Sequence, residues 1–373
     1  EGNNKCMRLL IYGYAPKEFG GEITGGVATY IGYLLKNLKG FKIGLLAENV
    51  RFFKREYGNV VVYGPPSKRW FLREILYTKT FKPNSKWLWN SRLKIIIDDL
   101  KPEVFYSHIP HSPANRMEVL RGLRFVLSFH SLHAYLFERD ENLKRRFYDS
   151  MLYSYNKAAK VVFPSSKVEK QVKELFGDRD KTVVIPPVVK VPNWDYTKEE
   201  SRKVLGLNGD LIVGFAGMLT GRKGEDLLIK ASVNKPWKLV IAGGGPGLNN
   251  AVKLARDLNV NAVFLGDISG DKLWHFYNSL DVFCLPSRSE TFGIAVVEAM
   301  LFGKKVVVSK EIPEEVAPEN LAIRVDLDVE SVAYGIDRAL SSNIKGDDIR
   351  NYALRFSDEE AFISKHLDVF ENP

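Results

Sequence analysis

Short apolar runs, rich in β-branched and aromatic residues, alternate with helical patterns along almost the whole chain. Most of the runs are continuous, which is typical of strands buried on both faces of a parallel sheet. The helical segments between them supply the crossovers that parallel strands need. The sequence therefore predicts an α/β fold of doubly wound, Rossmann-like parallel sheets. The expected strands are 9–14, 41–47, 60–63, 104–107, 125–129, 161–164 and 183–185, followed by 211–216, 238–242, 262–265, 282–285 and 305–309.

The chain has 373 residues, a length that suggests two domains. A proline-rich stretch of little periodicity, 186–196, predicts the linker between them. We expect a first domain over 1–188 and a second that begins at 189. Open α/β sheets bind ligands at the carboxyl ends of their strands, so two such domains are expected to face each other across a cleft.

Several classes of protein are excluded. No apolar run approaches the roughly 20 residues that cross a bilayer, and no signal peptide is visible. Residues 1–6 precede Met7, which is a candidate for the native start. The two cysteines, Cys6 and Cys284, cannot form a disulfide framework and have no metal-ligand spacing around them. We therefore expect a cytoplasmic protein.

The net charge of +9 is distributed unevenly. Residues 1–190 contain 33 Lys/Arg and 18 Asp/Glu, a balance of +15, whereas the remainder has 21 and 27, a balance of −6. Such a split predicts two domains with different partners, one of them anionic. Nucleic acid, a membrane surface and a phosphorylated substrate all fit this observation.

The first expected strand leads into a loop with Gly20-Gly21 and Gly25-Gly26, and a helix is predicted over 27–38. Glycines at the start of a helix let a ligand approach the backbone N–H groups, whose dipoles favour a phosphate. The loop is either such a turn or a flexible connection.

Histidines follow two of the expected strands. His130 comes directly after 125–129, and His108 and His111 follow 104–107. A histidine at the carboxyl end of a strand projects toward the ligand crevice, where it can hydrogen-bond a hydroxyl or phosphate oxygen or act as an acid or base. A buried structural histidine is the alternative.

Two glycine-bounded loops follow strands in the second half. One carries Arg222 and Lys223 directly before a helix, and two adjacent cations there suit a diphosphate. The other, 243–247, contains Gly244 and Gly245 and opens a helix whose N–H groups can face an anion. A solvated basic turn is the alternative for the first loop, and the second lacks the third glycine of a dinucleotide-binding motif.

A pair of glutamates follows the fourth expected strand of the second half. Glu290 falls on the loop before a helix that begins near Phe292, and Glu298 falls about two turns into it, so both can point to one edge of the crevice. The rest of this helix is apolar, and a buried carboxylate needs a partner. A sugar diol is one such partner, and a buried Glu–Lys pair is the alternative. The N–H groups of Phe292, Gly293 and Ile294 are expected to form a further phosphate-binding site.

In this order, the elements resemble the retaining glycosyltransferases of family 4, which have the GT-B fold of two Rossmann-like domains. The strongest match is Glu290 to Glu298, in the form E-x-F-G-I-x-x-x-E. The final stretch, 355–373, resembles the helix that crosses back onto the N-terminal domain in that fold, so the second domain is expected to end at 354. The remaining matches are Lys223-Gly224, the turn 243–246, 263–266 and His130.

The resemblance implies a nucleotide-sugar donor bound mainly by the second domain. Glu298 would hold the ribose hydroxyls, and Glu290 would hold the sugar together with the N–H groups of Phe292 and Gly293, with Ile294 also in the donor site. The glycine turn at Gly244 and Gly245 would add to the donor site.

The resemblance also implies a reaction that retains the anomeric configuration, by same-face attack assisted by the leaving phosphate. Lys223, with its neighbour Arg222, would stabilise the departing diphosphate. His130 and the backbone at Gly25 and Gly26 would face the reacting centre from the first domain. No metal ion and no other cofactor is implied, and the acceptor would be lipid-linked or a saccharide.

Two departures from the family pattern bear on this reading. Met218 stands where the family usually has an arginine, and Arg222 is the candidate replacement. The interdomain Pro-Asn-Gly of the family is replaced by Pro186-Pro187-Val188. A nucleotide-sugar epimerase and a non-catalytic nucleotide-sugar-binding protein therefore stay open as alternatives.

The acceptor side is expected to use residues 65–94. This segment holds eight Lys/Arg, one acidic residue and three of the six tryptophans. Basic residues interleaved with Trp and Tyr suit an anionic membrane surface or a lipid-phosphate acceptor. A helical insertion that packs its aromatic residues inward is the alternative, and no nucleic-acid motif accompanies the segment.

Overall fold

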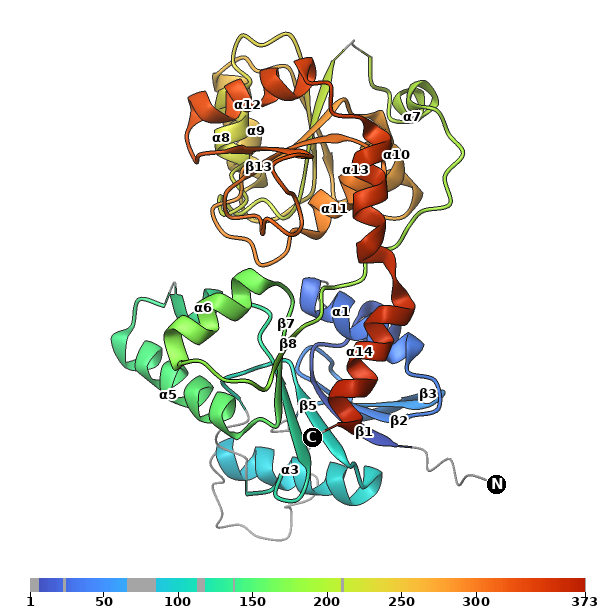
Figure 1. Ribbon diagram of the computed structural model, residues 1–373, viewed down its shortest axis with the longest axis vertical. Helices are drawn as coiled ribbons and strands as arrows, with labels where there is room; N and C mark the ends of the chain where they lie inside the picture. Colours follow the sequence, from blue (N-terminus) through green and yellow to red (C-terminus); the bar gives the residue numbers. More distant parts are fainter. Residues whose placement is uncertain are drawn as a thin grey trace. The chain divides into compact units, whose positions relative to one another are not determined.

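The computed structural model describes residues 7–22, 25–65, 85–112, 118–136, 138–208 and 211–372. The chain divides into two compact units (Figure 1). The N-terminal unit comprises 1–186 and 359–373, and the C-terminal unit comprises 187–358. The sequence had placed these boundaries at 188 and 354. No helix within the described ranges is both long and apolar enough to traverse a bilayer.

The N-terminal unit contains an eight-stranded sheet with the order β3-β4-β2-β1-β5-β6-β7-β8. All neighbouring strands are parallel except β3 and β4, which form an antiparallel pair at one edge. The predicted parallel α/β sheet is confirmed for this unit. The strands are β1 (Arg8–Gly13), β2 (Lys42–Ala47), β3 (Lys54–Tyr57), β4 (Val60–Tyr63), β5 (Val104–Ser107), β6 (Arg124–Ser128), β7 (Lys160–Phe163) and β8 (Thr182–Val184).

Side chains cap the N-termini of two helices of this unit. Asp140 accepts hydrogen bonds from the first N–H groups of α5, and Ser165 does the same for α6. The last helix of the chain, α14, packs against α1 through aromatic contacts of Tyr30 with Phe362 and His366. The helices are α1 (Gly26–Asn37), α3 (Ser85–Leu100), α4 (His133–Leu136), α5 (Glu141–Lys157), α6 (Ser166–Phe176) and α14 (Glu359–Glu371).

Most of the basic and aromatic segment 65–94 lies outside the described residues. At its described end, the Trp89 ring lies 6.0 Å from that of Tyr12, and Arg92 is fully buried. The guanidinium of Arg92 donates to the carbonyls of Gly64 and Phe53. These two side chains therefore follow the inward-packing alternative, and a membrane contact of this segment stays a prediction.

The C-terminal unit contains a six-stranded, fully parallel sheet with the order β11-β10-β9-β12-β13-β14. Its strands match the predicted α/β class, which is confirmed here too. The chain proceeds outward from β9 in one direction and resumes at β12 on the other side, so the strand order reverses beside β9. The strands are β9 (Ile212–Ala216), β10 (Lys238–Ala242), β11 (Ala262–Gly266), β12 (Val282–Leu285), β13 (Lys305–Ser309) and β14 (Ala322–Val325).

Helices cross between these strands and cover the sheet (Figure 1). The helix α7 has a complete capping box, in which Thr197 and Glu200 satisfy each other's backbone N–H groups. The helices are α7 (Lys198–Val204), α8 (Glu225–Ala231), α9 (Leu248–Asp257), α10 (Asp271–Ser279), α11 (Ile294–Leu301), α12 (Val329–Ser341) and α13 (Gly346–Ala353).

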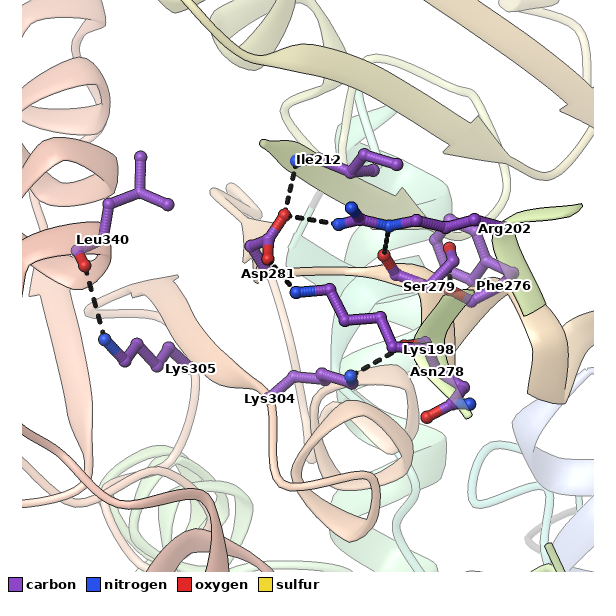
Figure 2. Close-up of polar contacts among 10 residues, drawn as sticks. All are labelled: Lys198, Arg202, Ile212, Phe276, Asn278, Ser279, Asp281, Lys304, Lys305 and Leu340. Atoms are coloured by element: carbon purple, nitrogen blue, oxygen red, sulfur yellow. Dashed lines mark hydrogen bonds and ion pairs between the residues drawn. The ribbon is translucent and has the colours of Figure 1, made fainter. Parts of the chain in front are cut away.

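A polar network ties α7 and α10 to the amino ends of the strands (Figure 2). Asp281, just before β12, accepts from the Ile212 amide and the Arg202 guanidinium, both at 2.7 Å, and pairs with Lys198. Lys304 donates to the Asn278 carbonyl at the end of α10. Cations at helix C-termini offset the negative end of the helix dipole. The network braces the edge of the sheet opposite the carboxyl-end loops.

Candidate active site

Three loops meet at the carboxyl ends of β9, β10 and β12, where the strand order reverses. Their approach is so close that two positions require glycine. A Cβ on Gly224, whose φ is +76°, would lie 2.0 Å from the carbonyl oxygen of Pro286. A Cβ on Gly243, whose φ is +132°, would lie 2.0 Å from the carbonyl oxygen of Gly217. The glycines of these loops thus allow the backbones to pack into one crevice wall.

An ion pair joins two of these loops. The Lys223 ammonium pairs with the Glu290 carboxylate, and the side chains are only 17% and 8% exposed. The sequence expected Glu290 and Glu298 to point to one edge of the crevice, and the described ion pair of Glu290 is with Lys223. The Glu–Lys pair that the sequence left as an alternative is present at Glu290. Removing either partner would leave the other charge unpaired at a largely buried position, which is energetically costly.

Arg222 lies beside this pair. Its guanidinium reaches the Ser289 carbonyl at 3.5 Å, and its own carbonyl accepts from the amide of Arg288 at 2.8 Å. These contacts fasten the Lys223 loop to the Glu290 loop. Met218, in the position of the family arginine, is 55% exposed.

Glu298 has a different partner. The Tyr277 hydroxyl donates to Glu298 Oε2 at 2.6 Å, from a position fully buried in the core. Burial raises the pKa of Glu298 to about 7, and the hydrogen bond from Tyr277 acts in the opposite direction. The sequence did not single out Tyr277, because an isolated tyrosine on a predicted helix carries no motif. Its hydroxyl orients one carboxylate oxygen of Glu298.

The start of α11 contributes backbone N–H groups, rather than side chains, to the candidate site. Gly293 is the N-cap, with φ +96°, and Ile294 is the first helical residue. Phe292 is buried and packs edge-on against Phe356 at 5.3 Å. The predicted phosphate-binding site at Phe292, Gly293 and Ile294 therefore lies at a helix N-terminus. The first N–H groups of a helix have no acceptor within it and can donate to an anion.

The glycine turn after β10 has internal partners. The Gly244 amide donates to Asp267 Oδ1 at 2.9 Å, and the Gly244 carbonyl accepts from Leu219 at 2.8 Å. Gly245 has φ +128° and lies against Leu219. The sequence missed Asp267, which follows the glycine that ends β11. A pocket of about 340 Å³ opens beside this turn, between the starts of α8 and α9.

In the N-terminal unit, His130 and His108 come together at the carboxyl ends of β6 and β5. Nδ1 of His108 lies 2.7 Å from Nε2 of His130. Burial lowers the pKa of His130 to about 3, and burial and the neighbouring imidazole hold the pKa of His108 well below its usual value. Both rings are therefore neutral at pH 7. The sequence placed each histidine after its strand but did not predict their pairing.

Gly25 and Gly26 are exposed at the start of α1. A Cβ added at either position would meet no heavy atom within 4 Å, and the φ of Gly25 is extended at −175°. The fold of this unit therefore does not itself demand glycine there.

A second pocket, of about 310 Å³, lies in the N-terminal unit. Its polar lining comes from His111 and from three residues of α5: Arg146, Asp149 and Ser150. The His111 ring packs on Phe147 at 4.9 Å. The α5 residues escaped the sequence reasoning because they belong to a helix rather than to a loop that follows a strand. Among the described residues, no cluster of His, Cys, Asp and Glu is arranged to hold a metal ion.

A chain with two doubly wound units and ligand-facing loops at the strand ends matches known families over most of its length. Residues 24–191 match the model for Glycosyltransferase Family 4, and residues 197–356 match the model for Glycosyl transferases group 1. The chain belongs to the family 4 glycosyltransferases and has the GT-B fold.

Two curated relatives and two solved structures illustrate this membership. The chain is 34% identical over 200 residues to the uncharacterized glycosyltransferase MJ1607 of Methanocaldococcus jannaschii, a match that covers 49% of this chain and 51% of that protein. It is 33% identical over 143 residues to D-inositol 3-phosphate glycosyltransferase of Mycolicibacterium smegmatis, covering 36% and 33%. The chain thus spans about half or less of the curated relatives it matches.

The solved structures match the fold over almost the full length. Sucrose-phosphate synthase from Thermosynechococcus elongatus has a TM-score of 0.79 at 18% identity, covering 98% of both chains. HepE from Anabaena, solved in complex with UDP and glucose, has a TM-score of 0.75 at 16% identity, covering 98% of this chain and all of that one. Identities this low show the fold alone.

Proposed function

We propose that the protein transfers a sugar from a nucleotide-sugar donor to a saccharide or lipid-linked acceptor, with retention of the anomeric configuration and without a metal ion. The observation that carries this proposal is the arrangement of Lys223, Glu290 and Glu298 around the carboxyl ends of β9 and β12. A cation, a sugar-binding carboxylate and a diol-binding carboxylate are the groups that such a donor requires.

Each group has a role that follows from its surroundings. Glu298 accepts the two ribose hydroxyls, because Tyr277 fixes one of its oxygens and only a hydrogen-bond donor satisfies the other. Glu290 binds hydroxyls of the transferred sugar. Lys223 is already oriented by Glu290, so its charge is in place for the diphosphate as the glycosidic bond breaks.

The N-terminus of α11 supports the diphosphate without a metal. The N–H groups of Gly293 and Ile294 carry the positive end of the helix dipole. Together with Lys223 and Arg222, they supply the positive charge that a divalent ion would otherwise bring. The leaving phosphate then serves as the base for the acceptor hydroxyl on the same face, so no covalent adduct on Glu290 is required.

The acceptor is proposed to use the N-terminal unit. Its 310 Å³ pocket offers the Arg146 guanidinium and the Ser150 hydroxyl, which suit an acceptor with an anionic group. The relatives' names support a phosphorylated acceptor, since one acts on D-inositol 3-phosphate. The HepE complex supports a uridine nucleotide as the donor base.

A donor panel tests the proposal. The protein is incubated with UDP-, GDP- and ADP-linked sugars, and thermal shift, hydrolysis and transfer to phosphorylated and lipid-linked saccharides are measured. We expect one nucleotide class to raise the Tm and to be turned over, with the product in the donor's anomeric configuration. No binding to any donor would overturn the proposal. Altered donor sugar without transfer would indicate an epimerase, and binding without turnover a non-catalytic module.

A further inference from the structure

The proton of a buried, neutral histidine can be assigned from the hydrogen-bond partners of its two ring nitrogens. His366 illustrates this, and the same reasoning applies to the His108–His130 pair. His366 Nδ1 lies 2.8 Å from the Phe362 carbonyl, which can only accept, so the proton is on Nδ1. Burial lowers the pKa of His366 to about 4, so its Nε2 is an acceptor at pH 7 and receives the Tyr30 hydroxyl at 3.1 Å.

The His108–His130 contact is between two neutral rings, so one nitrogen donates and the other accepts. Two arrangements satisfy the 2.7 Å contact. Either His108 Nδ1–H donates to His130 Nε2, or His130 Nε2–H donates to His108 Nδ1. The two arrangements differ in what they require of the remaining ring nitrogens.

The far nitrogen of His108 decides between them. His108 is 3% exposed, in a ring packed against Tyr106 at 4.2 Å, and its buried Nε2 has no hydrogen-bond partner among the residues that the structure describes. A proton on Nε2 would leave a buried N–H with no acceptor, and orphaned buried donors are rarer than under-satisfied acceptors. The proton of His108 therefore belongs on Nδ1, where it donates to His130.

The outer nitrogen of His130 is the one that a ligand can meet. His130 is partly exposed, and its Nδ1 has no hydrogen-bond partner within the described part of the chain. His130 Nε2 also lies 3.3 Å from the Ser128 hydroxyl, which can donate to it. Because Nε2 accepts from His108, the single proton of the neutral His130 ring sits on Nδ1.

We propose that His108 is a positioning residue that sets the tautomer of His130, so that His130 presents Nδ1–H as a hydrogen-bond donor to the ligand and does not act as a general base. The proposal rests on the proposed function for its ligand, a donor sugar hydroxyl or phosphate oxygen. His108 itself touches no substrate, and it acts through the orientation and protonation of its neighbour.

The tautomer is measured directly by long-range ¹H–¹⁵N correlation spectra of the full chain labelled with ¹⁵N-histidine, at pH 7. The His130 signals are assigned by their absence from His130→Asn, and those of His108 and His275 with His108→Asn, His108→Leu and His275→Leu. We expect the wild-type His130 to carry its proton on Nδ1. Asparagine places an amide N–H where His108 has Nδ1–H, so His108→Asn should keep this state. His108→Leu removes the donor and should move the His130 proton at least partly to Nε2.

Turnover of the donor found in the panel gives the second readout. His108→Leu should lower kcat by about tenfold or more with little change in donor KM, and His108→Asn should restore most of it. His275 is another buried histidine, which contacts Ser201 Oγ at 3.1 Å in the C-terminal unit. His275→Leu therefore controls for the loss of a buried imidazole and should leave the His130 signals unchanged.

The outcomes separate this proposal from the function on which it rests. A wild-type His130 with its proton on Nε2, or a His130 tautomer that does not respond to His108→Leu, overturns the positioning role whatever the activity. An equal kcat loss in the Asn and Leu variants also overturns it. A wild-type protein that turns over no donor defeats the proposed function and leaves the spectral test intact.

Discussion

The two units hold polar side chains at their strand ends in opposite ways. In the C-terminal unit, Lys223 and Glu290 are charged and paired across two loops. In the N-terminal unit, the His108 and His130 rings are neutral and lie among aromatic rings, with His108 buried and His130 partly exposed. The unit whose sequence carries the acidic excess thus has an ion pair at its strand ends, and the basic half has a neutral pair. The net charge of a unit thus indicates the charge of the partners that it attracts, whereas ion pairs and hydrogen bonds between individual side chains determine which group is presented to a ligand.

The largest effect is expected from breaking the charged pair. Lys223→Met should leave Glu290 as an unpaired carboxylate in a site that is 8% exposed, at a cost of about 3–5 kcal/mol in the free energy of unfolding. The double variant Lys223→Met/Glu290→Gln should recover most of this loss while donor turnover stays abolished. Urea unfolding of the singles and the double measures the recovery.

The exposed pair Lys310–Asp326 provides the matched control. Both side chains are more than 60% exposed, so Lys310→Met should change the unfolding free energy by less than about 1 kcal/mol. If Lys223→Met costs no more than this control, the pair is not buried as described and its role as an oriented cation fails.

The second effect is an opposite pH dependence of stability in the two units. The pKa values of His130 and His366 are lowered to about 3 and 4 in the folded N-terminal unit. Below about pH 6.5, these two histidines are therefore protonated in the unfolded chain but stay neutral in the folded unit. Stability from this cluster is complete above pH 6.5 and is lost as the pH falls toward 4. Glu298 has the opposite sign, because its raised pKa of about 7 makes the folded C-terminal unit bind a proton that the unfolded chain releases above about pH 4.5.

Hydrogen exchange resolved by unit, at pH 7.5 and pH 5.5, measures this divergence. We expect lower protection factors, which are corrected for the intrinsic pH dependence of amide exchange, in β5 and β6 at pH 5.5, with those of β12 and α11 unchanged or higher. Parallel behaviour of the two units would contradict the contrast between a neutral cluster and a carboxylate site.

A third effect separates stability from binding at Glu298. Glu298→Gln removes a carboxylate whose burial is costly when it is ionised, so the variant should be more stable than the wild type at pH 8 by roughly 1–3 kcal/mol. It should bind the donor nucleotide at least about tenfold more weakly, because an amide accepts fewer hydroxyl protons. Titration calorimetry and urea unfolding at pH 8 check both signs. A variant that binds as well as the wild type would remove Glu298 from the ribose site.

The parts of this molecule that sequence predicted are those with a local signature. Buried runs such as 104–107 and 282–285 became β5 and β12, because a continuous apolar segment between turn signals specifies a central strand. The strand β3, Lys-Arg-Glu-Tyr, was missed because an exposed edge strand pairs through its backbone and carries no apolar run.

Two residues that support the site were missed, and the pairing of a third was not predicted, for a related reason. Tyr277, Asp267 and His108 act on groups 21 to 23 residues away in the chain, and only the fold brings them together. The sequence marked Glu298, Gly244 and His130 because each follows a strand or opens a helix. Tyr277 and Asp267 were not singled out, and His108 was named only as a candidate after its own strand, because spacing along the chain predicts none of these contacts.

A fourth effect contrasts glycines of the two units. Gly224→Ala should destabilise the C-terminal unit by about 2 kcal/mol or more, since its φ is +76° and the new Cβ would lie 2.0 Å from the Pro286 carbonyl oxygen. Gly25→Ala should change stability by less than about 0.5 kcal/mol, because nothing surrounds that position, yet it should weaken donor binding if a ligand approaches the backbone there. Thermal unfolding and donor titration of both variants separate the two requirements. Unchanged donor affinity in Gly25→Ala would exclude a close approach at α1.

The smallest effect concerns the arginine that the family pattern expects. Met218 is 55% exposed, so Met218→Arg should leave the unfolding free energy within about 0.5 kcal/mol. If Arg222 already supplies the second cation beside Lys223, the added arginine should improve donor affinity by less than about threefold, and Arg222→Ala should weaken it by about tenfold. The combined variant Met218→Arg/Arg222→Ala should then recover part of that loss. A gain from Met218→Arg larger than the loss from Arg222→Ala would show that the diphosphate lies at the family position and that Arg222 serves only to fasten the loop to Ser289.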